Sequence, residues 1–101
     1  MVGEFEYLIL TAAARLGHRA YGASIRNEIK EAIGRNCSIG ALYITLDRLE
    51  SKGLIITSMG DATPQRGGRR KRMVRVTAEG ARMAREFYTD VTRITRGVSW
   101  A

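Results

Sequence analysis

The sequence holds very few of the residues from which metal sites and disulfide bonds are built. Among its 101 residues there is one cysteine, Cys37, and one histidine, His18. A single cysteine excludes an internal disulfide bond, and one cysteine with one histidine gives no ligand spacing for zinc. Cys37 could serve as a redox sensor, but a buried, unreactive thiol is the more common state of a single cysteine. We expect neither a metal nor a cofactor.

Long apolar segments and catalytic groupings are also missing. The nearly apolar stretch 7–14 is far shorter than the roughly 20 residues of a membrane span. It follows Glu4 and Glu6 instead of a basic region, so it does not fit a signal peptide, and we expect a cytoplasmic protein. The chain has no obvious pair of catalytic carboxylates and no glycine loop for phosphate, so we expect no enzyme.

Acidic residues are outnumbered by basic ones. The 17 Lys and Arg against 10 Asp and Glu give a net charge of +7. Six positive charges lie within residues 66–75 without a carboxylate among them: Arg66, Arg69, Arg70, Lys71, Arg72 and Arg75. Removing these six leaves about +1 for the remainder of the chain, so the excess charge is local. A local patch favours nucleic acid as the partner, and no basic amphipathic helix with Trp or Phe on its other face supports a membrane partner.

Residues 38–52 predict a helix with two different faces. Ser38 suits the N-cap, and Gly53 suits the left-handed residue that follows a helix. Apolar residues at helical spacing are expected to be buried: Ile39, Leu42, Leu46 and Leu49. The outward face would then hold Gly40, Ala41, Tyr43, Ile44, Thr45, Arg48 and Lys52. Small residues at a helix start allow close approach to a major groove, and the hydroxyl and basic groups can reach phosphates or base edges.

A β-hairpin is expected after this helix. Residues 54–59 and 72–77 read as antiparallel strands, and residues 60–68 form the loop between them. A merely solvated surface loop is the plain alternative, because runs of like charge are often only solvated. Its position beside an exposed helix favours contact with a phosphate backbone instead.

Three further helices are predicted. Residues 5–16 and 21–33 each carry apolar residues at helical spacing, with Ile25, Ile29 and Ile33 on the core side of the second. Phosphate contact and ordinary surface charge both remain open for Arg26, Lys30 and Arg35. The last helix, from Thr77 to about Arg96, bears an apolar stripe of Met83, Ala84, Phe87, Tyr88, Val91 and Ile94. Its second half is expected to extend beyond the domain, and an exposed apolar stripe marks an interface.

Four motifs in this order resemble the PadR family of transcriptional regulators. They are FEYLIL at 5–10, YGASI at 21–25, ALYITLDRLESKGLI at 41–55 and VTAEG at 76–80. Ile44 stands where the family commonly has proline, and Met73 and Val74 stand where aromatic residues are common. The resemblance covers most of the chain.

The element order and this resemblance imply a mainly α (α+β) fold. Residues 1–77 would form a winged helix-turn-helix with a two-stranded hairpin as the wing, and residues 78–101 a C-terminal dimerisation helix and tail. The resemblance implies a sequence-specific DNA-binding regulator, more often a repressor than an activator, which acts as a homodimer on a palindromic operator in double-stranded DNA. It also allows a small aromatic effector between the paired domains, on which Trp100 or Tyr88 could stack.

The expected site residues fall into three groups. Those expected in the groove are Ser38, Gly40, Tyr43, Thr45 and Arg48, and those expected on the backbone or minor groove are Arg66, Arg69, Arg70 and Lys71. The dimer contacts would be Phe87, Tyr88, Val91 and Ile94. The alternative is a winged-helix adaptor that binds proteins without specific DNA readout, but an adaptor does not need six positive charges on its wing. RNA binding is disfavoured because no exposed aromatic platform is evident.

Overall fold

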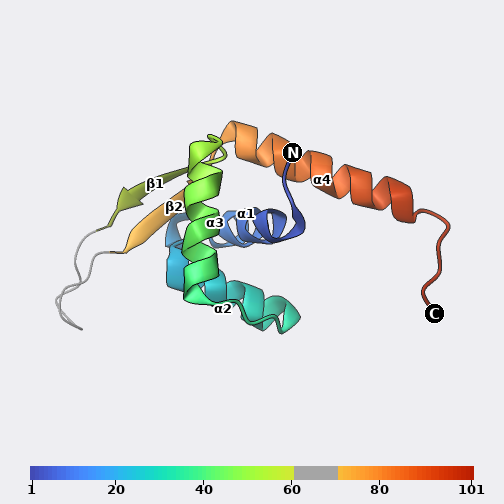
Figure 1. Ribbon diagram of the computed structural model, residues 1–101, viewed down its shortest axis with the longest axis horizontal. Helices are drawn as coiled ribbons and strands as arrows, with labels where there is room; N and C mark the ends of the chain where they lie inside the picture. Colours follow the sequence, from blue (N-terminus) through green and yellow to red (C-terminus); the bar gives the residue numbers. More distant parts are fainter. Residues whose placement is uncertain (61–70) are drawn as a thin grey trace.

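The computed structural model describes residues 1–60 and 71–101. In chain order the elements are α1 (Glu4–Leu16), η1 (Gly17–Arg19), α2 (Gly22–Ile33), α3 (Ile39–Ser51), β1 (Ile55–Met59), β2 (Arg72–Val76) and α4 (Ala78–Thr95). Figure 1 shows α1, α2 and α3 gathered in the middle, with the hairpin on one side and the carboxyl end of α4 on the other. This is the winged helix-turn-helix order that the sequence predicted.

The helix boundaries agree with the capping residues. The Ser38 hydroxyl oxygen accepts a hydrogen bond from the Ala41 amide at 3.1 Å, and the Thr77 hydroxyl oxygen accepts one from the Gly80 amide at 3.0 Å. Each bond satisfies an amide of the first helical turn that has no partner within the helix. Gly34 ends α2 with a φ of 69°, a left-handed conformation that glycine adopts without strain.

The hairpin is joined to the chain that precedes α2. Strands β1 and β2 pair antiparallel, with Ile55 opposite Val76 and Met59 opposite Arg72. On its other edge β2 makes a bridge between Met73 and Tyr21, and the Val74 amide donates to the Ala20 carbonyl oxygen at 2.9 Å. Strand β2 is therefore fixed to the residues just before α2 as well as to its own partner strand.

The core lies where α1, α2, α3 and β1 meet. Its largest fully buried side chains are Ile9, Leu10, Ile25, Leu42, Leu46, Leu49 and Ile55. Two residues that we predicted to be in the core, Ile33 and Ile39, are exposed. Ile33 is the last residue of α2 and Ile39 the first of α3. Both lie at helix ends, where fewer neighbouring elements cover a side chain than along the middle of a helix.

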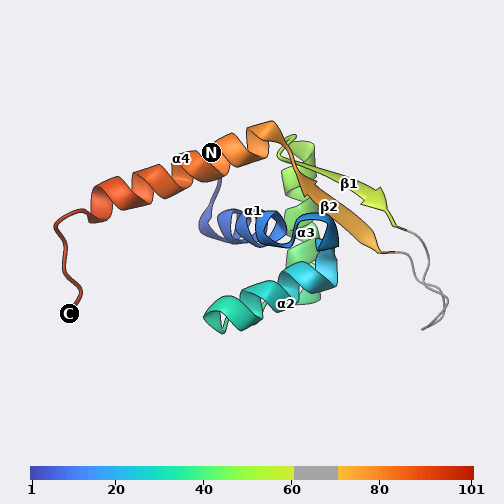
Figure 2. The ribbon, with the colours of Figure 1, turned by 180° about the vertical axis from the view of Figure 1, so that it is seen from behind.

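Helix α4 has a packed first half and an exposed second half. The Phe87 ring stacks on the Tyr7 ring of α1, with 4.7 Å between ring centroids. Beyond it Tyr88, Val91 and Ile94 are exposed, and Figure 2 shows that this end of the helix leaves the central cluster. Within the described part of the chain, no helix is both long and apolar enough to cross a membrane.

Candidate nucleic-acid interface

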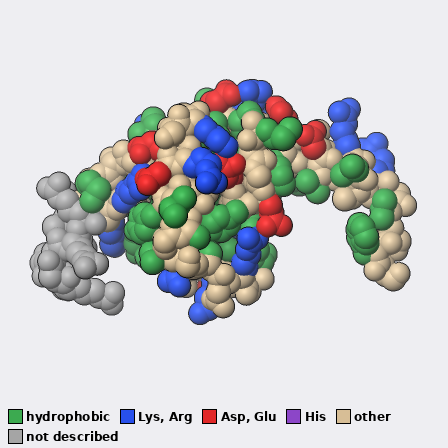
Figure 3. Space-filling view, in the orientation of Figure 1, with side chains coloured by type: hydrophobic (Ala, Val, Ile, Leu, Met, Phe, Trp, Pro, Cys, Tyr) green, Lys and Arg blue, Asp and Glu red, His purple; other side chains and the backbone are tan. Residues whose placement is uncertain are grey.

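The outward face of α3 is exposed along its length. Of the residues predicted for the groove, Ser38, Gly40, Tyr43 and Arg48 are exposed, as is the intervening Ile44. Figure 3 shows this side of the molecule with hydrophobic side chains in its middle and Lys and Arg side chains above and below them. A face of this kind can approach a groove while its basic groups reach toward phosphates.

Thr45 does not belong to this face. The prediction that it points outward is wrong, because its exposed fraction is only 5%. Its hydroxyl donates to the Ala41 carbonyl oxygen at 2.8 Å, one turn earlier in the helix. At 100° per residue, position 45 lies about 40° from the buried Leu49 and about 60° from the buried Leu42, at the edge of the buried face. The sequence prediction placed Thr45 outward because it is not one of the apolar residues of the predicted stripe, whereas the structure extends the buried face to include it.

Tyr43 is held against the start of α2. A methyl group built on Gly22 would lie 2.6 Å from the Tyr43 hydroxyl oxygen and 2.9 Å from the ring carbon that bears it. Carbon and oxygen atoms that are not bonded do not approach so closely, so the Tyr43 ring occupies the space that a side chain at position 22 would need. The absence of a side chain at Gly22 therefore lets α3 lie close to α2 with Tyr43 in a defined position.

The loop end of the hairpin carries a positive charge beside this contact. The Lys71 ammonium lies 4.5 Å from the centroid of the Tyr21 ring, in the range of a cation–π interaction. Arg66, Arg69 and Arg70, the other wing residues predicted to contact DNA, lie outside the described residues. Lys71 contacts Tyr21 and Tyr43 contacts the adjacent Gly22, so both side chains lie against the start of α2.

Arg72 is engaged within the chain. Its guanidinium group lies 2.9 Å from the Asp47 carboxylate and 3.1 Å from the Glu50 carboxylate, both on α3. The same Glu50 accepts hydrogen bonds from the Thr57 hydroxyl and amide, and chiefly the hydroxyl bond lowers the pKa of Glu50, with a further contribution from Arg72. The sequence prediction counted Arg72 among the six positive charges of the wing that have no carboxylate among them in the chain. It could not identify the acidic partners of Arg72, because they lie more than 20 positions earlier.

A second ion pair holds the carboxyl end of α3. The Lys52 ammonium lies 2.8 Å from the Glu6 carboxylate of α1, and the Gly3 amide donates to the same carboxylate at 2.9 Å. Burial alone would raise the pKa of Glu6, but the hydrogen bonds from Lys52 and Gly3 lower it below its ordinary value. Lys52 was expected only on the outward face, so this pairing was missed. No pattern in the sequence pairs residues 46 positions apart.

Two of the basic residues near α2 also bind within the chain. The Arg26 side chain donates to the Cys37 carbonyl oxygen at 2.7 Å. Arg35 lies 2.6 Å from the Glu4 carboxylate and 5.3 Å from the centroid of the Phe5 ring. These contacts fix the connection between α2 and α3, and Cys37 is half-buried in it. Residues 1–60 and 71–101 contain no group of three His, Cys, Asp or Glu side chains that could hold a metal ion.

Comparison with known proteins identifies the family to which this chain belongs. The family model called "Transcriptional regulator PadR-like family" matches residues 9–86, which is most of the chain. The chain belongs to this PadR-like family. Curated proteins gave no match.

Solved structures with the same fold include other members of the PadR-like family. A PadR family transcriptional regulator from Eggerthella lenta has a TM-score of 0.70 at 26% identity, over 90% of this chain and 77% of that one. Bacillus subtilis PadR in complex with operator DNA has a TM-score of 0.65 at 23% identity, over 83% of this chain and 46% of that one. F93 from STIV, a winged-helix DNA-binding protein, has a TM-score of 0.72 at 21% identity, over 90% of each chain. These likenesses confirm the winged-helix fold.

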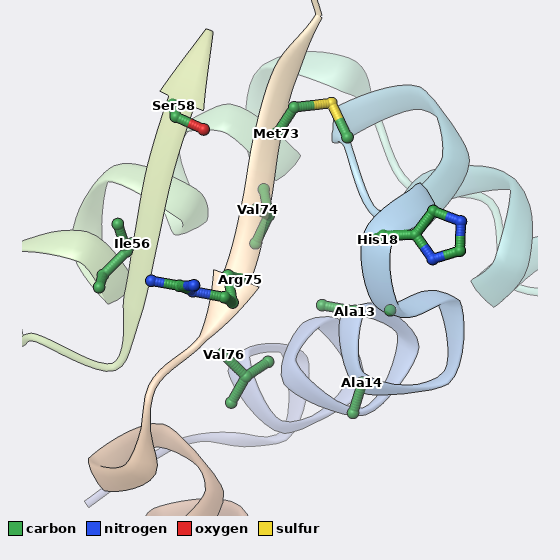
Figure 4. A pocket seen from close by; sticks show the side chains of 10 residues that line it. Ala13, Ala14, His18, Ile56, Ser58, Met73, Val74, Arg75 and Val76 are labelled. Carbon is green, nitrogen blue, oxygen red and sulfur yellow. The ribbon is translucent and has the colours of Figure 1, made fainter. Parts of the chain in front are cut away.

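This PadR-like chain also has an open pocket away from α3. It measures about 710 Å³ and lies between the end of α1, η1 and the two strands. Figure 4 shows His18 on the η1 side and Arg75 on β2, with Val74 and Val76 between them. Neither Tyr88 nor Trp100, the side chains expected to stack on an effector, lines this pocket.

Proposed function

We propose that this PadR-like regulator is a sequence-specific repressor that binds double-stranded DNA through α3 and the wing. The observation that carries the proposal is the exposed, narrow start of α3 together with Lys71, which lies at the loop end of the hairpin against Tyr21. Gly40 and Ala41 allow a close approach to the floor of a major groove, and Lys71 stands on the wing immediately before β2. The Bacillus subtilis PadR that was determined with operator DNA has the same fold, which is consistent with this use of the elements.

The interface consists of a groove part and a backbone part. Ser38, Gly40, Tyr43 and Arg48 face the groove, and Thr45 is excluded because it is buried. On the wing Lys71 supplies a phosphate contact, and the sequence adds the charges of Arg66, Arg69 and Arg70. An adaptor that binds proteins would gain nothing from this separation into small, apolar groups in the centre and cations at the edge.

Salt dependence tests the backbone part. The affinity for a duplex of random sequence is measured by fluorescence anisotropy at several salt concentrations, for the parent protein and for Lys71→Gln. Removing one phosphate interaction should make the slope of log K against log salt shallower by about 0.9. Arg85→Gln on α4 is the matched control, since it removes one positive charge outside the hairpin and α3. Equal slopes for the parent and Lys71→Gln would remove Lys71 from the interface.

Selection of duplexes from random DNA tests the groove part. The parent protein should enrich one sequence, and Tyr43→Ala should lose affinity for that sequence more than for random DNA. The difference should be about 1–3 kcal/mol if Tyr43 makes a good base contact. Equal losses on both duplexes would assign Tyr43 to backbone positioning. Enrichment of no sequence by the parent protein would contradict sequence-specific binding altogether.

We further propose that residues 78–101 hold two copies together through the exposed half of α4. The helix has 18 residues and is therefore about 27 Å long, and Ile94 near its end is 79% exposed. Tyr88 and Val91 are exposed on the same half, whereas Phe87 is partly covered by Tyr7 of its own chain. A second copy of the chain is the expected partner for these exposed apolar side chains, because a symmetric dimer places two copies of α3 on one side of a duplex.

The dimer is tested by light scattering of Val91→Glu with Ile94→Glu. Carboxylates in an apolar interface cost several kcal/mol unless they find partners, so the double variant should be a monomer that keeps its helical circular dichroism. The control is Thr89→Glu with Arg93→Glu, which places two carboxylates on the other side of the same helix and should remain a dimer. Phe87 is left unchanged, because its replacement would also disturb the packing on Tyr7. A double variant that stays dimeric would contradict the proposal.

The small aromatic effector stays a prediction. Tyr88 and Trp100 are both largely exposed in the single chain, so a ligand stacked on either ring would need a second copy to cover it. This prediction therefore depends on the dimer.

A further inference from the structure

Ile44 stands in the middle of the outward face of α3 with most of its side chain in solvent. Its exposed fraction is 62%. Gly40, one turn earlier on the same side of the helix, has open space where a side chain would be, and Ala41 adds only a methyl group. Ile44 therefore protrudes beyond Gly40 and Ala41 toward whatever lies against α3.

Two of the hydrogen-bonding groups near Ile44 are engaged within the chain. The Thr45 hydroxyl donates to the Ala41 carbonyl oxygen at 2.8 Å. The Asp47 carboxylate lies 2.9 Å from the Arg72 guanidinium group. Gly40, Ala41 and Ile44 therefore present carbon atoms at the centre of the outward face, while the polar ends of Tyr43 and Arg48 lie to its sides. A base edge that meets this centre is met by apolar contact.

The chemistry of DNA limits what such a centre can recognise. Of the groups that base pairs present in the major groove, the C5-methyl group of thymine is the apolar one. The net charge of +7 favours a polyanion as the occupant of this face over an apolar protein surface. We propose that Ile44 packs against the C5-methyl group of a thymine and makes each half-site depend on thymine at that position. The inference rests on the proposed function, since it requires α3 to enter the major groove.

Deoxyuridine offers a direct test, because it pairs as thymidine does and lacks only this methyl group. A duplex that the parent protein selects from random DNA is remade with each thymine replaced in turn by deoxyuridine. At one position in each half-site the replacement should weaken binding by the parent protein about four-fold, the effect expected for one buried methyl group. For Ile44→Ala the same replacement should leave the affinity unchanged, because the partner of the methyl group is already gone.

Ile56→Ala is the matched control. Ile56 is also an exposed isoleucine, at 49%, but it belongs to β1 and lines the open pocket instead of the outward face of α3. This variant should respond to the deoxyuridine replacement as the parent protein does. Circular dichroism and thermal unfolding confirm that both variants are folded before their affinities are compared.

The outcomes separate this inference from the proposed function. A parent protein that selects one duplex but tolerates deoxyuridine at every position would show that Ile44 reads no methyl group, while DNA binding stands. An Ile44→Ala variant as sensitive to the replacement as the parent would assign the methyl contact to another residue. A parent protein that selects no duplex at all would contradict the proposed function, and this inference with it.

Discussion

Replacing Lys52 with methionine should destabilise the protein more than replacing its partner, Glu6, with glutamine. The two side chains differ in their access to water: the Glu6 side chain is 9% exposed and that of Lys52 is 37% exposed. Removing Lys52 leaves a buried carboxylate with little compensation beyond the hydrogen bond from Gly3. Removing the charge of Glu6 leaves an ammonium group that can turn toward solvent, and the glutamine oxygen can still accept from Gly3.

The magnitudes follow from this asymmetry. Leaving a fully buried charge without its partner costs about 3–5 kcal/mol, and partial access to water at Lys52 reduces the value of the pair, so about 2–3 kcal/mol is expected for Lys52→Met. For Glu6→Gln about 1 kcal/mol is expected, the net value of a hydrogen bond. Urea denaturation followed by circular dichroism measures both free energies of unfolding. Arg82→Met is the control, because the pairs of Arg82 with Glu79 and Glu86 are exposed to water and should contribute little to stability.

The pH dependence gives a second readout of the same pair. In the parent protein the pKa of Glu6 is lowered on folding, so its contribution is present above the ordinary pKa of 4.5 and is lost as the pH falls through the folded value. In Lys52→Met burial opposes ionisation with less compensation, so the folded pKa should rise. Lowering the pH from 7 toward 4 should then reduce the difference in stability between this variant and the parent. Equal destabilisation by both substitutions, or a difference that does not vary with pH, would refute the reasoning.

Replacing Gly22 or Gly80 with alanine should have different effects on selectivity and stability, and Gly40→Ala is the reference for both. A methyl group on Gly40 has open space, so Gly40→Ala should raise the free energy of unfolding by about 0.5–1 kcal/mol through helix propensity. Gly22→Ala should keep the fold but displace the flexible end of Tyr43, and crystallography of the variant with an operator binding assay should show a moved ring and weaker selectivity. Gly80→Ala would bring its methyl group against the Leu54 backbone carbonyl, which cannot move freely, so thermal unfolding should report a loss of about 1–3 kcal/mol or more. A Gly80→Ala protein as stable as the parent would show that α4 shifts at no cost.

Local patterns predicted the elements of this fold and most of their buried faces. Helical spacing placed Leu42, Leu46 and Leu49 in the core, and the capping residues Ser38 and Thr77 marked two helix starts. These predictions succeeded because caps and helical periodicity depend on residues a few positions apart. The same method failed at helix ends, where Ile33 and Ile39 have the right spacing but too few neighbours to cover them.

The contacts that orient the candidate site could not be predicted in this way. Arg72 pairs with α3 across 22 and 25 positions, and Lys52 with Glu6 across 46. A charged residue looks alike in sequence whether it faces solvent or a partner from another element. Thr45 is a different failure, since it lies at the edge of the apolar stripe and was placed outward as a polar residue, whereas the structure buries it.

Helix α3 is held from three directions, and this has a consequence for how DNA selectivity can change. Tyr43 packs against Gly22 of α2, Lys52 is tied to Glu6 of α1, and the Asp47–Glu50 side is tied to the hairpin by Arg72. None of these contacts uses the centre of the outward face. Substitutions in that centre should therefore alter base preference with little change in stability. Substitutions in the supporting contacts should lower stability and selectivity together, because a helix that can tilt no longer presents its side chains at fixed positions. Measuring both quantities for one variant thus distinguishes a residue that reads DNA from a residue that supports the helix.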